Sequence, residues 1–212
     1  MTAVSLEPGH RAGLLRRALR LEVLTVGWNV VEGLVAIGAG LASGSVALIG
    51  FGVDSFVESA SGLVLLWRLD AERRDASHER IERVEHRAQR LVAGSLVLLA
   101  GYIAIDAGAS LINGERPQPS AVGIGLAIAS IVVMRWLAGA KHRVGVALGS
   151  RAMTADAFQT NACFWLSVAL LAGIGLNALL GWWWADPLAA LGMAALIARE
   201  AVEVWNGEDD CC

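Results

Sequence analysis

The sequence predicts an all-α membrane protein, a bundle of six transmembrane helices with both termini in the cytoplasm. Of its 212 residues, 56% are hydrophobic and 17% are charged, and the mean hydropathy is +0.56. This composition is typical of membrane proteins and fits a soluble domain poorly. The apolar residues gather in six segments of about 20 residues, the length needed to cross roughly 30 Å of hydrocarbon.

The six predicted spans and a short tail make up the chain. The first span is too long for a cleaved signal peptide and lacks a small-residue cleavage site, so we expect it to be retained. Links after the first, third and fifth spans are short, whereas the other two carry charge, so the chain zigzags in hairpins. We predict one transmembrane domain over residues 1–205, with spans at 19–41, 46–69, 91–112, 120–140, 153–176 and 187–204, and an acidic tail at 206–212.

The basic residues predict the orientation. Of the 17 Lys and Arg residues, only Arg116 falls on the side that we place outside. This positive-inside pattern puts both termini in the cytoplasm, and we expect an integral, multi-pass protein of a bacterial inner (plasma) membrane. The charged link at 70–90 has acids and bases three to four residues apart, which predicts a solvated helical extension. Its His78 and His86 are too far apart to share one metal without a third element.

Asp54 and Glu58 are the most informative residues, because they lie four residues apart inside an otherwise apolar span. Positions i and i+4 of a helix point the same way, so both carboxylates face a common point. An ionised group at mid-membrane costs about 2.5–3.5 kcal/mol on insertion scales, so such a pair is usually compensated by ions, partners or protons. The pair therefore indicates a cation site.

Other polar side chains also fall within the spans. Each marks either a functional site or an interhelical hydrogen bond that holds the bundle together. For Glu22, near the cytoplasmic end, we favour the bonding role. For Asn29, Glu32 and Asp106 both readings stay open, since these residues lie deeper and can line a pathway. The fifth span adds Asp156, Gln159 and Asn161.

The fifth span faintly repeats the second. "GSVA" begins at Gly44 and "GSRA" at Gly149, and equal offsets from these motifs lead to Asp54 and Gln159, and to Glu58 and Cys163. Two facing pairs of metal-competent side chains would supply four ligands, the number that a tetrahedral divalent ion takes.

"SGSVALIGFGVDSFVES" and "SRAMTADAFQTNAC" resemble the second and fifth membrane helices of the cation diffusion facilitator (cation efflux) family. These six-span transporters export divalent metals, commonly Zn²⁺, in exchange for protons. The resemblance covers the whole membrane unit, including the "ADP" that opens the last span at 185–187. It implies metal ligands at four positions of this chain: Asp54, Glu58, Gln159 and Cys163.

The chain departs from the family pattern in the fifth span, where Gln159 replaces the usual His and Cys163 the usual Asp. A thiolate prefers Zn²⁺ or softer metals. Asp156, two turns from Cys163, is either a substitute ligand or entrance acid, or a residue that packs near Arg151. The resemblance is to compact members without a soluble cytoplasmic domain.

The tail ends in Cys211 and Cys212. No disulfide is expected in a reducing cytoplasm, and the two thiols either capture metal or have no role.

The sequence thus predicts proton-coupled efflux of Zn²⁺ or a similar metal (Mn²⁺, Fe²⁺, Co²⁺ or Cd²⁺) from the cytoplasm, with the metal as cargo and no permanent cofactor. The expected partners are the cation, protons, the lipid bilayer and a second copy in a homodimer, without nucleic acid. One alternative is a non-transporting, metal-binding or regulatory membrane subunit, and another is a small proton-coupled exporter of organic cations. An enzyme is not expected, because all four His residues lie outside the spans.

Overall fold

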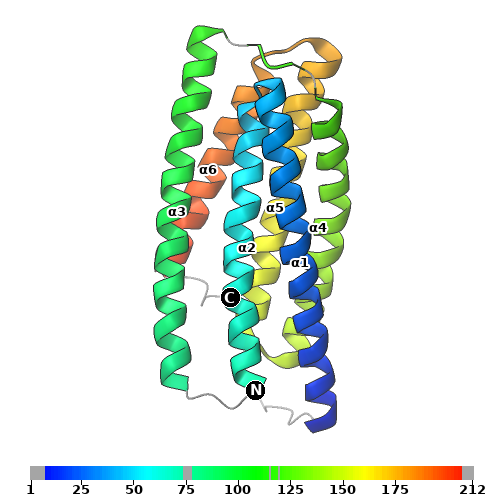
Figure 1. Cartoon of the computed structure of the whole chain (residues 1–212), viewed down its shortest axis with the longest axis vertical. Helices are drawn as coiled ribbons and strands as arrows, with labels where there is room; N and C mark the ends of the chain where they lie inside the picture. The colour runs from blue at the N-terminus through cyan, green and yellow to red at the C-terminus, as the bar shows by residue number, and fades with distance from the viewer. Residues whose placement is uncertain (1–7, 74–77, 115, 119, 207–212) are drawn as a thin grey trace.

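A computed structural model describes residues 8–73, 78–114, 116–118 and 120–206 (Figure 1). Apart from α4, which begins one residue after the expected start, each helix contains one predicted span. The predicted extension around the charged link is confirmed as far as Arg73 and from His78, while 74–77 and the His78 and His86 side chains lie outside the described part. The helices are α1 (Pro8–Ser43), α2 (Val46–Arg73), α3 (His78–Asn113), α4 (Ala121–Leu148), α5 (Arg151–Leu180) and α6 (Ala185–Asn206).

Helices α1 to α5 each contain a stretch long and apolar enough to cross a membrane. The sixth predicted span, at 187–204, lies in α6 but is not among these stretches within the described residues. Its sequence carries three charged residues near its end, at 199, 200 and 203, which lower its hydropathy. Helix α6 packs along α3 and also contacts α2 and α5, so it is part of the same bundle.

The helices pack as three pairs, α1 with α2, α4 with α5, and α3 with α6. The first two pairs join into a four-helix core, and the α3–α6 pair lies beside it (Figure 1). The α1–α2 contact is close because glycines face each other: a Cβ on Gly33 would lie 2.9 Å from the Gly52 carbonyl oxygen. Small residues at a contact let membrane helices approach closely.

A two-residue turn, Gly44–Ser45, separates α1 from α2. Gly44 has a φ of 70°, in the left-handed region that favours glycine. The Ser45 N–H donates to the Gly40 carbonyl at 3.1 Å and closes α1. The Ser45 hydroxyl oxygen accepts the Leu48 N–H at 3.1 Å and caps α2.

The turn between α4 and α5 has the same geometry, 105 residues later (149–150 against 44–45). Gly149 has a φ of 64°, the Ser150 N–H donates to the Gly145 carbonyl at 3.0 Å, and the Ser150 hydroxyl accepts the Met153 N–H at 3.4 Å. The four-letter echo in the sequence is therefore a structural repeat. Since successive helices alternate in direction, α1–α2 and α4–α5 form an inverted repeat.

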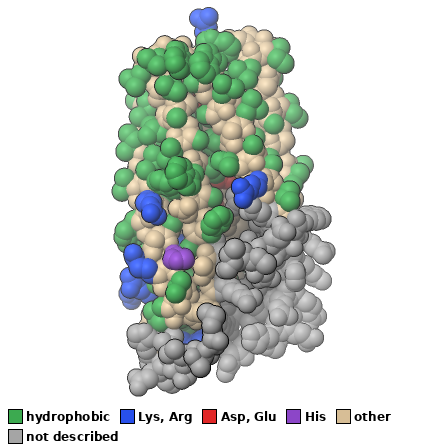
Figure 2. Space-filling view, turned by 180° about the vertical axis from the view of Figure 1, so that it is seen from behind, with side chains coloured by type: hydrophobic (Ala, Val, Ile, Leu, Met, Phe, Trp, Pro, Cys, Tyr) green, Lys and Arg blue, Asp and Glu red, His purple; other side chains and the backbone are tan. Residues whose placement is uncertain are grey.

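The apolar core has two parts. The outer cluster lies toward the α1–α2 turn and includes Ala36, Phe51 and Ala127. The inner cluster lies toward the opposite end and includes Met134 and Met153. On the face in Figure 2, apolar side chains cover the upper half, and most of the visible Lys and Arg side chains lie lower down. This distribution fits the predicted cytoplasmic position of the lower end.

The left-handed turn can be tested with Gly44→Ala. An L-residue in this conformation costs about 1–2 kcal/mol, so we expect the free energy of unfolding in detergent micelles to fall by that amount. Gly38 is the matched control, because a Cβ at Gly38 or Gly44 meets nothing within 4 Å and only Gly44 has positive φ. Gly38→Ala should leave stability unchanged or raise it. Unfolding of both variants is followed by circular dichroism. An equal loss of stability in the two variants would contradict the assigned turn.

Candidate metal centre

Asp54 and Glu58 lie on one face of α2 and are 5% and 4% exposed. Cys163 of α5 faces them and is also buried. Its sulfur lies 2.9 Å from Glu58 Oε2 and 3.7 Å from Asp54 Oδ2, so the thiol is positioned to donate to either carboxylate. The packing of α2 on α5 thus brings together three of the four ligands that the sequence predicts.

All three groups bind a metal only after losing a proton, so metal affinity at this position depends on pH. As the side chains stand, no three His, Cys, Asp or Glu residues in the described part of the chain are arranged to hold a metal ion together. The close approach of Sγ to Glu58 suits a protonated thiol that donates a hydrogen bond. Binding of a metal would replace this thiol proton.

The fourth ligand is less defined. Gln159 is half-buried, and no hydrogen bond joins it to the other three residues in the described structure. Asn29 of α1 is fully buried within reach of Glu58, and neither its amide oxygen nor its amide nitrogen has a partner at good hydrogen-bond geometry among the described residues. Oxygen Oε1 of Glu58 is also buried without a hydrogen bond. Sequence position selects Gln159, whereas the packing of α1 on α2 brings Asn29 to the pair.

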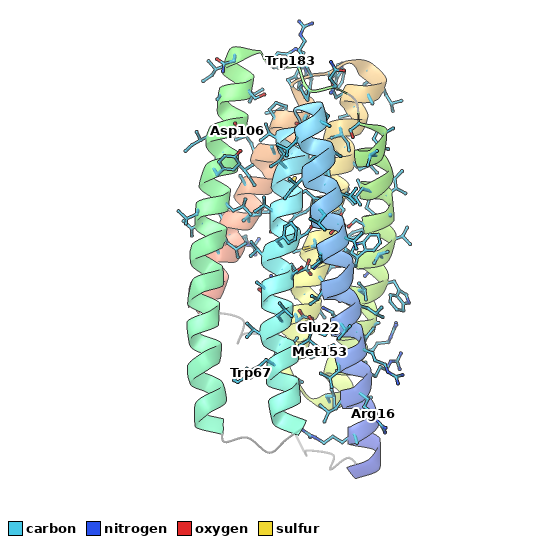
Figure 3. The ribbon with its side chains drawn as sticks, in the orientation of Figure 1. Arg16, Glu22, Trp67, Asp106, Met153 and Trp183 are labelled. Carbon is cyan, nitrogen blue, oxygen red and sulfur yellow. The ribbon has the colours of Figure 1, made fainter. Side chains whose placement is uncertain are left out.

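Glu32 and Asp106 occupy different environments. Glu32 is buried and both of its oxygens are bonded, Oε2 to the Ser55 hydroxyl at 3.0 Å and Oε1 to the Trp28 ring N–H at 3.1 Å. The Ser55 bond ties α1 to α2, and the Trp28 bond lies within α1. Asp106 is half-buried on α3 and lies far along the bundle from Glu22 (Figure 3). Asn161 is half-buried on α5.

A buried lysine forms the centre of a second polar cluster. Lys141 of α4 is 0% exposed, and its Nζ lies 2.6 Å from Asp156 Oδ2 and 3.0 Å from Glu22 Oε2. It also donates to Thr160 Oγ1 at 3.3 Å. The expectation that Glu22 joins helices fits these contacts. The sequence predicts Asp156 either as a substitute ligand or entrance acid or as a residue that packs near Arg151. Neither interpretation includes its ion pair with Lys141.

The sequence predicts Lys141 among the basic residues of the cytoplasmic face, and the structure corrects this by burying its side chain in the core. One signal was present in the sequence. Lys141 is the only lysine in the chain, and every other basic residue among the 17 is arginine. The two side chains are not interchangeable: arginine is the usual choice for buried ion pairs, so a single lysine among arginines marks a position that uses a compact ammonium group.

The polar residues form a column along the four-helix core. Glu22 lies toward the end that carries Arg16 and Trp67, away from Trp183 (Figure 3). Asp156 precedes Cys163 by seven residues, which is about 10 Å along a helix. Beyond the pair, toward the outer end, the core consists mainly of apolar side chains, with Ser130 and Ser167 near the pair and Asp186 at the outer turn as buried polar residues. Cys211 and Cys212 lie outside the described residues, so metal capture by the tail stays a prediction.

Comparison with known proteins places the chain in a family. The family model of the cation efflux transmembrane domain matches residues 23–205. An uncharacterized transporter of Synechocystis is 30% identical over 195 residues, which are 91% of this chain and 61% of the relative. The cation-efflux pump FieF of Shewanella oneidensis is 27% identical over 175 residues (78% and 57%), and the magnetosome protein MamB of Magnetospira is 26% identical over 184 (85% and 61%).

This chain spans about three fifths of the length of these relatives. The family match begins in α1 and ends in α6, so it includes the helices that carry Asp54, Glu58 and Cys163. The chain therefore belongs to the cation efflux family, as an integral, multi-pass membrane protein.

Proposed function

We propose that this chain carries a divalent metal cation out of the cytoplasm in exchange for protons, with Asp54, Glu58 and Cys163 as ligands. The observation that supports this most directly is the position of the Cys163 sulfur, 2.9 Å from Glu58 and 3.7 Å from Asp54 in the middle of the core. Three proton-releasing ligands on two facing helices suit an ion that exchanges with protons. The cation-efflux name of one relative agrees with this proposal.

The exchange follows from competition for the same atoms. A bound dication favours the deprotonated carboxylates and thiolate, while the metal-free pair of neighbouring acids favours at least one proton, because like charges at close range repel. Metal and proton then exclude each other. The inverted repeat gives two structural units, α1–α2 and α4–α5, whose rocking about the site would expose it to either side in turn.

The ligand types favour Zn²⁺. One thiolate and two carboxylates suit a borderline metal better than Mn²⁺, and Zn²⁺ prefers four ligands. We propose that an amide oxygen completes the set. Asn29, whose amide is buried without a partner at good hydrogen-bond geometry, competes for this place with Gln159, which the family pattern selects.

Removal of either carboxylate charge tests the site. Asp54→Asn or Glu58→Gln should lower metal uptake into proteoliposomes under an imposed pH gradient by about tenfold or more, because each loses a negatively charged ligand. Asp106→Asn on α3 is the matched control and should transport like the wild type. Wild-type rates in both site variants would refute the assignment. Metal binding without flux in the wild type would support the non-transporting subunit instead.

Cys163→Ser tests the metal preference. Replacing a soft thiolate by a hard hydroxyl should lower uptake of Zn²⁺ and Cd²⁺ more than uptake of Mn²⁺, following ligand softness. The measurement is the ratio of initial uptake rates for the metals in matched vesicles. Equal losses for all of them would mean that Cys163 contributes packing rather than a ligand.

Asn29→Ala and Gln159→Ala together test the fourth ligand. Both remove an amide without adding volume. We expect Asn29→Ala to weaken Zn²⁺ binding by roughly tenfold, which is about 1.4 kcal/mol, and Gln159→Ala to change it little, because only Asn29 then supplies the fourth ligand. Isothermal titration of the purified variants measures the effect. A loss confined to Gln159→Ala would assign the place to Gln159.

A further inference from the structure

We propose that Glu22 and Asp156 form a second binding station for the same divalent cation, on the cytoplasmic side of the Asp54–Glu58–Cys163 site. The ammonium of Lys141 fills this station in the structure described and leaves it when a metal ion enters. The inference rests on the proposed function, because it concerns the route by which the cation reaches the deeper site.

The station is a cage of oxygen atoms around a cation. The Lys141 ammonium meets Asp156 Oδ2 at 2.6 Å, Glu22 Oε2 at 3.0 Å and Thr160 Oγ1 at 3.3 Å. These three contacts match the three N–H donors of an ammonium group. Carboxylate and hydroxyl oxygens are also ligands of hard divalent cations. The cage is therefore suited to a positive ion, and the ammonium group of Lys141 already occupies it.

The cage holds more acidic groups than the lysine can neutralise. Two carboxyl groups face one ammonium, so one negative charge is in excess when both acids are ionised. Oxygen Oε1 of Glu22 is fully buried and makes no hydrogen bond. Gly62 of α2 packs directly against this oxygen, because a Cβ there would lie 2.7 Å from it. A structural ion pair requires only one acid, so the second carboxyl group and its unbonded oxygen supply ligand atoms beyond those that the lysine uses.

The inverted repeat shows that the fold does not require these charges. Positions 105 residues away from Glu22, Lys141 and Asp156 are occupied by three buried apolar residues of the outer cluster: Ala127, Ala36 and Phe51. The corresponding positions toward the other end of the core are thus filled without charge. Because buried ion pairs can often be replaced by apolar residues without loss of stability, we assign the charges on the inner side to ion movement.

The station lies on the route to the deeper site. Asp156 precedes Cys163 by two helical turns, about 10 Å. Glu58 lies within electrostatic range of Lys141 and Asp156. A change of cation in the station therefore changes the electrostatic potential at the Asp54–Glu58 pair. A dication from the cytoplasm would displace the ammonium and then move inward, and the returning ammonium would occupy the route behind it.

The native chain allows a direct test, because Lys141 is its only lysine. Purified protein is treated with a water-soluble amine reagent, with and without Zn²⁺ or Mn²⁺, and modification of the Lys141 peptide is followed by mass spectrometry. We expect saturating metal to raise the labelling rate of Lys141 several-fold, with the N-terminal amine as internal control. The response should persist in Asp54→Asn/Glu58→Gln, whose station is intact.

Two outcomes separate this inference from the proposed function. Unchanged labelling of Lys141, although Zn²⁺ binds at the Asp54–Glu58 pair, overturns the station and leaves the transport proposal standing. Absence of both metal binding and uptake overturns the transport proposal, and the station with it.

A charge-matched pair of variants gives a second readout. Lys141→Gln empties the station, so equilibrium dialysis should show one additional Zn²⁺ bound per chain at concentrations where the wild type binds only at the deeper site. Lys141→Gln/Asp156→Asn restores the net charge of the cluster and removes a ligand, and should lose the additional ion. Equal metal content in the two variants overturns the station. The labelling experiment uses the native chain and decides the question even where a variant fails to fold.

Discussion

Buried charge is the constraint on which the rest of the bundle depends. Glu22, Asp54 and Glu58 are withdrawn from lipid into the core, and Lys141 is the one basic residue buried there among the described side chains. Its ion pairs join α1, α4 and α5. Loss of one partner of a buried pair typically costs 3–5 kcal/mol, because it leaves the other charge uncompensated. The four-helix core therefore assembles stably only when its buried charges are paired.

The inverted repeat supplies the geometry of the core, and its divergence gives the core two unlike ends. Both halves have the same left-handed glycine and the same serine cap. Around this common frame, the outer end packs Phe51 between small residues, while the inner end places Asp156 at the corresponding position. The cluster of two acids around Lys141 thus lies on the cytoplasmic side of the pair, and no buried lysine or arginine lies on the outer side among the described residues. The outer side also holds buried oxygen atoms, which belong to Ser130 and Ser167 near the pair and to Asp186 at the outer turn.

The helices and the acid pair could be predicted from the sequence, because hydropathy and i, i+4 spacing act within one helix. Lys141 was missed because the fourth span was expected to end at residue 140, whereas α4 continues to Leu148. Two further turns carry Lys141 from a helix end into the core. Asn29 was read as a residue that either lines a pathway or bonds helices, since its position against Glu58 arises from packing between α1 and α2. Spacing along one helix carries no information on such contacts.

The two charged clusters are close enough to influence each other. Unit charges 10 Å apart interact by about 1.7 kcal/mol at an effective dielectric constant of about 20, which is slightly more than a factor of ten in a binding constant. A dication in place of the Lys141 ammonium adds one positive charge to the inner station. In the proposed mechanism this charge acts on a dication at Asp54, Glu58 and Cys163, so the repulsion doubles to about 3.3 kcal/mol and weakens metal binding there by roughly two orders of magnitude. Conduction through adjacent sites needs such repulsion, because an ion held too tightly would not leave. In the proposed mechanism, the second cation thus assists release of the first toward the outer side.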